Sequence, residues 1–103
     1  MSAVEYVNAN RHRYLLMKKM QELMSTVDVV ICPTRGSGNQ SAITNLTGHP
    51  AICVPTGFDS RSKLPTSITF IGQLYEEGKL LSAVEAYQSL TNWHLQHPEW
   101  VKQ

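Results

Sequence analysis

Residues 27–34 of the chain read VDVVICPT, and residues 51–54 read AICV. Residues 29–32 and 51–54 are short apolar runs, and a proline follows each of them, at Pro33 and Pro55. Apolar runs without alternating polar positions are typical of strands that are covered on both faces of a sheet. Such strands usually lie in the middle of a large sheet, so we expect the sheet of this chain to be part of a larger one.

Further elements are predicted on either side of these two strands. Ile68 and Phe70 alternate with polar side chains, which predicts a third strand over residues 66–71. Residues 42–47 have a short helical pattern, with Ser41 as a possible N-cap and Gly48 as its stop.

Two longer helices are predicted at the ends of the chain. Residues 4–24 carry a methionine-rich apolar stripe at helical spacing, which we expect to face the core. Residues 76–96 form the last predicted helix, and Pro98 follows it. The predicted fold class is therefore α/β, in the order helix, strand, short helix, strand, strand, helix, within a single domain over residues 1–103.

Composition excludes several classes of function. Nine Lys and Arg against eight Asp and Glu give a net charge of +1, so no nucleic-acid partner is expected. No apolar run reaches the ~18 residues of a membrane span, and the first residues do not have the pattern of a signal peptide. We expect a cytoplasmic protein with no membrane partner, in which Cys32 and Cys53 are buried, reduced thiols.

No stretch of the chain predicts self-contained catalysis. Ser37 lies between two glycines but lacks the full Gly-x-Ser-x-Gly spacing of a nucleophile, so a loop serine is expected. Nothing favours the pairing of a cysteine with a histidine. His94 and His97 lack a third metal ligand, and no phosphate-binding glycine motif occurs. We therefore assign no catalytic residue, no metal site and no cofactor.

The order of the motifs resembles the amidase signature family. Residues 27–34 are similar to its D-V-L-L-x-P-T strand, and residues 44–58 (TNLTGHPAICVPTGF) to its T-N-L-T/A-G-x-P-A-I-x-V-P-x-G-F stretch. Residues 64–72 (LPTSITFIG) resemble L-P-x-x-x-x-x-I-G, and residues 80–94 resemble the closing motif of the family. The resemblance covers nearly the whole chain, in the family's order, and it corresponds to the carboxyl-terminal part of the family.

This resemblance implies a role without catalysis. Members of the family hydrolyse or transfer amide nitrogen with a Ser–cis-Ser–Lys triad, which lies upstream of the part matched here. The resemblance implies a place in a large mixed sheet, and it assigns residues 34–43 to the wall of the acyl pocket, with Asn45 holding the loop. The alternative for Asn45 is an ordinary capping or turn role. The wall residues implied in this way are Thr34, Arg35, Gly36, Ser37, Ile43 and Asn45.

Three functions follow from these observations. The first is the carboxyl-terminal part of an amidase, a carboxamide C–N hydrolase that acts through an acyl-serine; here the chain supplies scaffold and pocket wall, and the partner is the amide substrate. The second is a stand-alone binding or self-assembly module, a homo-oligomer that pairs through open strand edges. The third is a small enzyme that uses Ser37 or a cysteine. Residues 34–44 hold no acidic side chain, which disfavours recognition of a glutamine amino group.

Overall fold

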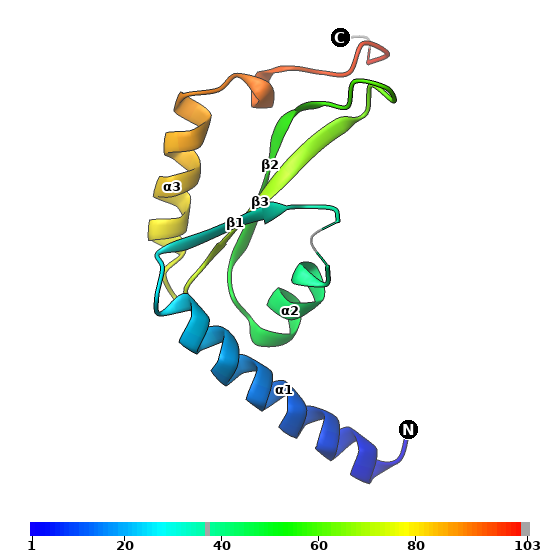
Figure 1. The fold of residues 1–103 in the computed structure, drawn as a ribbon, viewed down its shortest axis with the longest axis vertical. Coiled ribbons are helices and arrows are strands. Elements are labelled where there is room, and N and C mark those ends of the chain that lie inside the picture. The colour runs from blue at the N-terminus through cyan, green and yellow to red at the C-terminus, as the bar shows by residue number, and fades with distance from the viewer. Residues whose placement is uncertain (37, 102–103) are drawn as a thin grey trace.

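Strand β3 lies between the two other strands of an antiparallel sheet with the order β1-β3-β2 (Figure 1). The computed structural model describes residues 1–36 and 38–101. Its strands are β1 (Val29–Pro33), β2 (Ala51–Phe58) and β3 (Pro65–Gly72). Its helices are α1 (Ala3–Met24), α2 (Gln40–Thr47), α3 (Glu77–Ser89) and a 3-10 turn (Trp93–Leu95). The predicted class and element order are confirmed.

Two element boundaries differ from the predicted ones. Strand β2 continues beyond Pro55 to Phe58, because a register shift between Pro55 and Gly57 accommodates a residue that has no N–H to donate. The last helix ends at Ser89 instead of near Gln96. There the Leu90 N–H and the Thr91 hydroxyl both donate to the Tyr87 carbonyl, at 3.2 and 3.1 Å.

The short helix α2 begins earlier than predicted. Its N-cap is Asn39 and not Ser41, and it ends at Gly48, as expected from the sequence. Gly48 has a φ of 80°, a left-handed conformation that glycine adopts without steric cost.

The core lies between α3 and one face of the sheet. Val54 and Phe70 from the sheet pack with Leu80 and Val84 from α3, and all four are buried. The ring of Tyr87 lies 5.7 Å from that of Phe70, and its hydroxyl donates to the Pro55 carbonyl at 3.3 Å. The buried core residues therefore come from β2, β3 and α3, and the half-buried Val29 of β1 packs against them.

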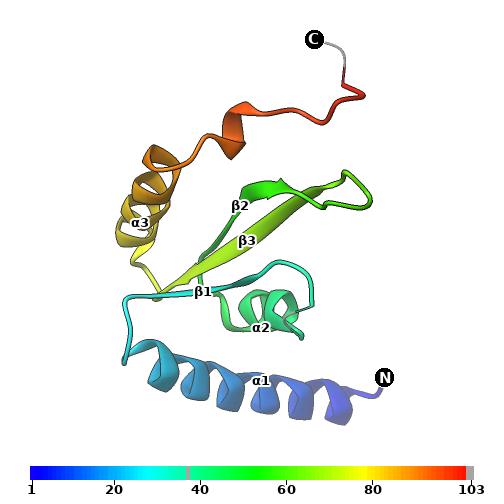
Figure 2. The same cartoon turned by 45° about the horizontal axis from the view of Figure 1, so that its top comes forward.

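Helix α1 extends away from the sheet (Figures 1 and 2), and its predicted apolar stripe faces the rest of this chain only in the second half of the helix, where Leu16, Met17 and Met20 are half-buried. Met24 is its only buried residue, whereas Tyr6 is 62% exposed and Leu23 is 56% exposed. At its carboxyl end, Gln73 Nε2 donates to the carbonyls of Met24 and Val27 at 3.0 and 2.9 Å. None of the helices in the described ranges is long and apolar enough to cross a membrane.

The molecule is elongated for its length. Its radius of gyration is 17.0 Å, whereas a compact chain of 100 residues has about 13 Å. Its extents are 52 × 31 × 21 Å, and the long dimension includes α1. The helix that contributes most to the length thus exposes most of its side chains.

We predict that Gly72→Ala destabilises the fold. An added Cβ would lie 3.1 Å from Leu80 Cβ, and Leu80 is buried at the centre of the core. Overpacking of this kind costs about 1–3 kcal/mol in the free energy of unfolding, which urea denaturation followed by circular dichroism would measure. Gly78→Ala is the control, because a Cβ there meets nothing within 4 Å. Equal stability of the two variants would contradict this packing.

We also predict that His49 makes stability depend on pH. Its side chain is only 4% exposed, its Nδ1 lies 2.8 Å from the Thr47 hydroxyl, and burial lowers its pKa below 6.5. Below pH 6.5 the unfolded chain therefore binds more protons than the folded one. The free energy of unfolding consequently decreases as the pH is lowered, by at most about 1.4 kcal/mol per pH unit.

Urea denaturation between pH 7.5 and pH 5 would measure this loss of stability. His49→Gln should flatten the profile, while His12→Gln, at an exposed position on α1, should keep it. A His49→Gln profile with the slope of the unmodified chain would assign the pH dependence to other groups.

Candidate functional site

The face of the sheet opposite α3 carries a cluster of hydroxyl and thiol side chains. Cys32 on β1 and Cys53 on β2 both pair with Thr69 on β3, so the three side chains share one face. The residues of β3 that pack in the core, Ile68 and Phe70, alternate with Thr69 and point to the other side. Helix α2 lies between the sheet and α1 (Figures 1 and 2).

A cavity of about 280 Å³ lies where this face meets α2. Thr34 follows β1 directly, and its N–H donates to the Ser67 carbonyl at 3.3 Å, which places its side chain at the cavity. The Thr34 hydroxyl lies 3.0 Å from that of Thr69 and 3.3 Å from Cys53 Sγ. The lining consists of Thr34, Gln40, Ser41, Thr44, Asn45, Ala51, Cys53 and Thr69.

Helix α2 supplies the opposite wall through two pairs of residues that are four apart. Gln40 and Thr44 form one pair, and Ser41 and Asn45 form the other, so a single helical face carries them. The Thr44 hydroxyl donates within its own helix, at 3.1 Å to each of the carbonyls of Gln40 and Ser41. Gln40 Oε1 is buried and has no hydrogen-bond partner among the described residues.

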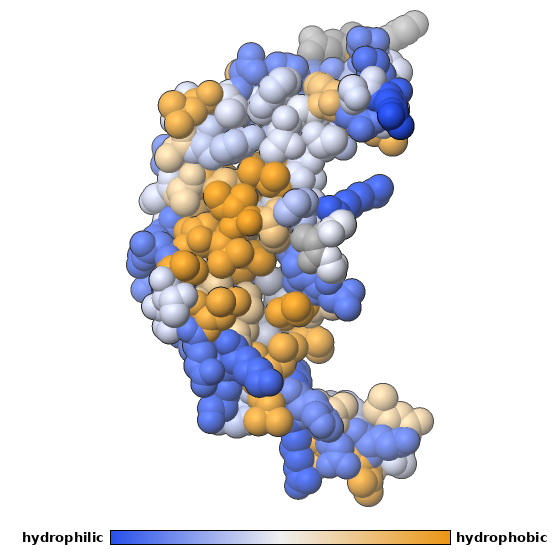
Figure 3. Space-filling model, in the orientation of Figure 1, coloured by the Kyte–Doolittle hydropathy of each residue, from blue (hydrophilic) through white to orange (hydrophobic). Residues whose placement is uncertain are grey.

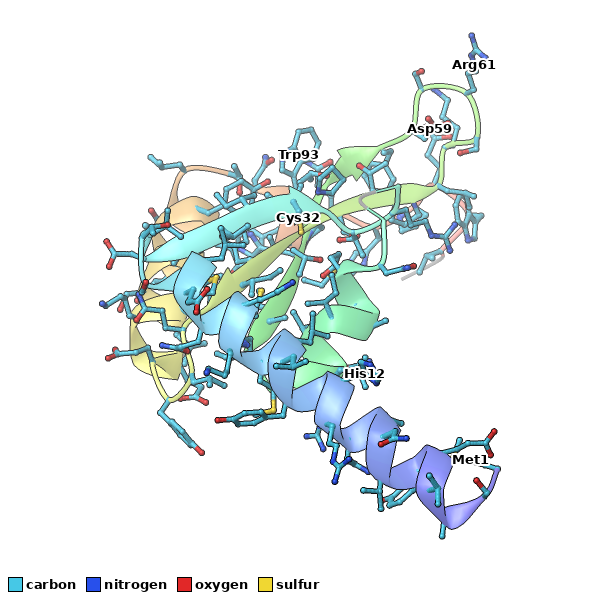
Figure 4. The ribbon with its side chains drawn as sticks, turned by 60° about the horizontal axis from the view of Figure 1, so that its bottom comes forward. Met1, His12, Cys32, Asp59, Arg61 and Trp93 are labelled. Atoms are coloured by element: carbon cyan, nitrogen blue, oxygen red, sulfur yellow. The ribbon has the colours of Figure 1, made fainter. Side chains whose placement is uncertain are left out.

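The two cysteines are free, but they are less buried than expected. Cys32 is half-buried and Cys53 is exposed, so the prediction of a buried thiol is wrong for Cys53. Strand β3 separates them, which puts their Cα atoms about 9–10 Å apart at the usual strand spacing, beyond the reach of a disulfide. Figure 4 shows Cys32 on β1 well apart from His12 on α1, so these two residues do not form a nucleophile–base pair.

Cys53 is the titratable group of the cavity. Partial burial raises the pKa of its thiol, but hydrogen bonds from Ser67, Thr34 and Thr69 together lower it below its ordinary value. None of the described residues that line the cavity is a carboxylate, a histidine or a lysine, so no general base faces its hydroxyl groups. The described part of the wall offers hydroxyl, amide and thiol groups that can hydrogen-bond a neutral polar ligand.

The implied wall residues are distributed over two cavities. Thr34 and Asn45 line the first, together with Gln40 and Ser41. Arg35 lines a second cavity of about 660 Å³, between the end of β1 and residues 64–67, and Thr34 borders this one too.

Three further implied wall residues lie outside these linings or outside the description. Ile43 is half-buried in α2 and is not part of either lining. Gly36 is exposed in the loop, with a φ of 81°. Ser37 lies outside the described residues.

Four lining residues were not predicted from the sequence: Thr44, Ala51, Cys53 and Thr69. The alternation of Ile68 and Phe70 already places Thr69 on the face opposite the core. Its pairing with Cys53 depends on the register between β2 and β3, which no local pattern indicates.

We predict that Cys53 is alkylated by iodoacetamide faster than Cys32, because it is more exposed and its lowered pKa gives more thiolate at neutral pH. Thr34→Val should slow the reaction of Cys53 and move its pH midpoint upward. Thr56→Val is the control, because that hydroxyl pairs with Thr66 at 3.1 Å, away from the cavity. Mass spectrometry between pH 6 and pH 10 measures both rates, and an unchanged midpoint in Thr34→Val would contradict the hydrogen bond.

Comparison with known proteins relates the chain to one component of an amidotransferase. It is 32% identical over 111 residues to the A subunit of glutamyl-tRNA(Gln) amidotransferase from Legionella pneumophila (strain Corby), which covers 90% of this chain and 23% of that protein. The corresponding protein of Thermosynechococcus vestitus is 32% identical over 112 residues, with 91% and 23% covered. No family model matches the chain.

The structural comparison agrees with the sequence comparison. The crystal structure of the A subunit of glutamyl-tRNA(Gln) amidotransferase from Thermotoga maritima matches 73% of this chain and 20% of its own, with a TM-score of 0.60 and 25% identity. Residues 34–44 hold no acidic side chain, yet the chain matches these amidotransferase proteins, so this feature does not distinguish the chain from them. This chain spans about a fifth of the length of the relatives it matches, and it is homologous to that segment of the amidase signature family.

Proposed function

We propose that the chain forms a non-catalytic wall of the acyl pocket in an amidase-signature enzyme that breaks a carboxamide C–N bond. The observation that carries the proposal is the cavity of Thr34, Asn45 and their neighbours, whose described lining offers hydrogen-bonding groups and contains no carboxylate, histidine or lysine. The chain is homologous to about a fifth of an amidotransferase protein, which supports a role as one part of a larger catalytic fold. The nucleophile and its base then come from the part of the fold that this chain does not match.

The wall would act on the acyl group of the substrate. In the proposed reaction the base takes the proton of a serine hydroxyl while its oxygen bonds to the carbonyl carbon, and the C–N bond then breaks as the nitrogen leaves with that proton. Water afterwards cleaves the acyl-serine ester, which releases the acyl group as a carboxylic acid and restores the serine hydroxyl. The Thr34 hydroxyl and the Asn45 amide hold the uncharged end of the acyl group during these steps. Such positioning matters because a displacement of about 1 Å costs on the order of 100-fold in rate.

A chimera tests this proposal. The matched 111-residue segment of the Legionella pneumophila protein is replaced by this chain, and ammonia release from simple carboxamides is measured. Thr34→Val and Asn45→Ala should lower kcat/KM by about 10- to 100-fold, because each removes a hydrogen-bonding group from the pocket. The isolated chain should show no turnover above the blank.

Leu90→Ala is the matched control for the chimera. Leu90 is 86% exposed, and it lines neither of the two cavities at the end of β1. Thermal unfolding of each variant shows whether a loss of activity reflects a loss of fold. Full activity of a folded Thr34→Val, Asn45→Ala double variant would contradict a role in the pocket.

A stand-alone assembly module is the second candidate function. The exposed stripe of α1, which includes Tyr6, Tyr14 and Leu15, is the observation that favours it. In that case the isolated chain would associate with itself in solution, and light scattering would report a mass above that of the monomer.

A further inference from the structure

The second cavity, of about 660 Å³, is the larger of the two that lie at the end of β1. Figure 3 shows the surface hollowed between the loop that joins β2 to β3 and the end of β1, with hydrophilic residues on both sides. The role proposed for Thr34 and Asn45 concerns the first cavity and leaves the second one without a ligand. Its lining consists of an apolar part, Pro33, Leu64 and Pro65, and a polar part, Thr34, Arg35, Thr66 and Ser67.

Arg35 is the only charged residue in the described lining of this second cavity. The ion pair that the described residues form joins Lys79 to Asp28, so no described carboxylate lies within ion-pair distance of Arg35. An arginine side chain stays protonated in proteins, so the described lining carries one positive charge without a partner. The cavity is therefore suited to an anionic group.

The segment that contributes to both cavities is positively charged as a whole. Residues 33–67 hold three basic side chains and one acidic side chain, a charge of +2 in a chain whose net charge is +1. The acidic residue, Asp59, uses its Oδ1 within its own loop, where it accepts hydrogen bonds from the N–H groups of Arg61 and Ser62 at 3.1 and 2.6 Å. Figure 4 shows Arg61 at the outer end of that loop. The electrostatic field at this end of the sheet thus favours anions over ammonium groups.

A carboxylate matches the second cavity better than a phosphate does. The planar guanidinium of Arg35 can donate two parallel hydrogen bonds to the two oxygens of a carboxylate, and one positive charge balances one negative charge. A phosphate carries more negative charge than a single arginine neutralises. The apolar side chains of Leu64 and Pro65 reduce the contact of such an ion pair with water, which strengthens it.

The two cavities share Thr34, so a ligand that fills both of them passes this residue. We propose that Arg35 binds a carboxylate at the far end of the acyl group, so that the substrates are monoamides of dicarboxylic acids. The amide then lies in the first cavity, beside Thr34 and Asn45, and the carboxylate lies in the second. Successive Cα atoms are about 3.8 Å apart, so Thr34 and Arg35 suit a short acid such as glutaric acid.

The acid needs no amino group, because neither described lining holds a carboxylate that could pair with an ammonium group. The inference rests on the proposed function for its statement that the ligand is the substrate. Binding of the carboxylate at Arg35 can be measured without that function.

A titration of the isolated chain with glutaramate, followed by the NMR shifts of its backbone amides, tests the carboxylate site. The amides of Arg35, Thr66 and Ser67 should shift saturably in the millimolar range, and the neutral diamide glutaramide should leave them unchanged. Arg35→Gln should weaken binding by at least about 10-fold, because it removes the charged partner of the carboxylate. Arg61→Gln is the matched control, because it removes the same charge from outside the lining.

The chimera described above tests whether this ligand is the substrate. Ammonia release should favour glutaramate over glutaramide by about 10-fold or more in kcat/KM, and Arg35→Gln should bring this ratio close to unity. Arg35→Lys keeps the charge but not the paired hydrogen bonds, so it should retain part of the preference. Arg61→Gln should keep the full preference.

Each outcome supports or overturns a stated part of the inference. The lack of saturable shifts at Arg35, or binding that Arg35→Gln leaves intact, would overturn the site. Tighter binding of inorganic phosphate at the same amides would overturn the choice of a carboxylate. Binding of glutaramate at Arg35 together with a folded but inactive chimera would support the site and reject the proposed function. An active chimera without a preference for glutaramate would support the proposed function and overturn the substrate class.

Discussion

Strand β3 pairs along both of its edges, and the remaining elements take their positions from that pairing. Its even-numbered residues, Ile68 and Phe70, face α3 and form the core, whereas Thr69 points to the other face. There the Thr34 hydroxyl, which follows β1, lies within hydrogen-bonding distance of both the Thr69 hydroxyl and Cys53 Sγ on β2. A single strand thus separates the part of the molecule that stabilises the fold from the part that could contact a ligand.

The small size of this core limits what the chain can do by itself. The core consists of Val54, Phe70, Leu80 and Val84 with half-buried neighbours, and close contacts such as Gly72 against Leu80 leave no room for a larger residue. Helix α1 adds little to it, because only its last residue, Met24, is buried. Apolar side chains on α1 and Ile31 on β1 therefore remain in contact with water, although their burial would be favourable.

Much of this arrangement could be predicted from local patterns, and the failures have a common cause. The alternation of Ile68 and Phe70 predicted β3, and Gly48 predicted the end of α2, because both signals depend on neighbouring residues only. The stripe on α1 also indicated an apolar face correctly, but periodicity cannot tell which polypeptide covers that face. The early end of α3, where the Leu90 N–H and the Thr91 hydroxyl both donate to the Tyr87 carbonyl, is not visible in the spacing of the apolar residues.

The candidate site shows the same limit at the level of single residues. The order of the motifs was sufficient to relate the chain to its family, and it pointed to Thr34 and Asn45, which line one cavity. Cys53 and Thr69 could not be assigned to that cavity, because only the register between β2 and β3 brings them to Thr34. The absence of charge in the described lining then has a physical meaning. In the role proposed here, a wall that only holds an acyl group needs donors and acceptors at fixed positions, and a charged group buried there would add a desolvation cost without helping to break the C–N bond. The hydroxyl, amide and thiol groups of the described lining are consistent with that requirement.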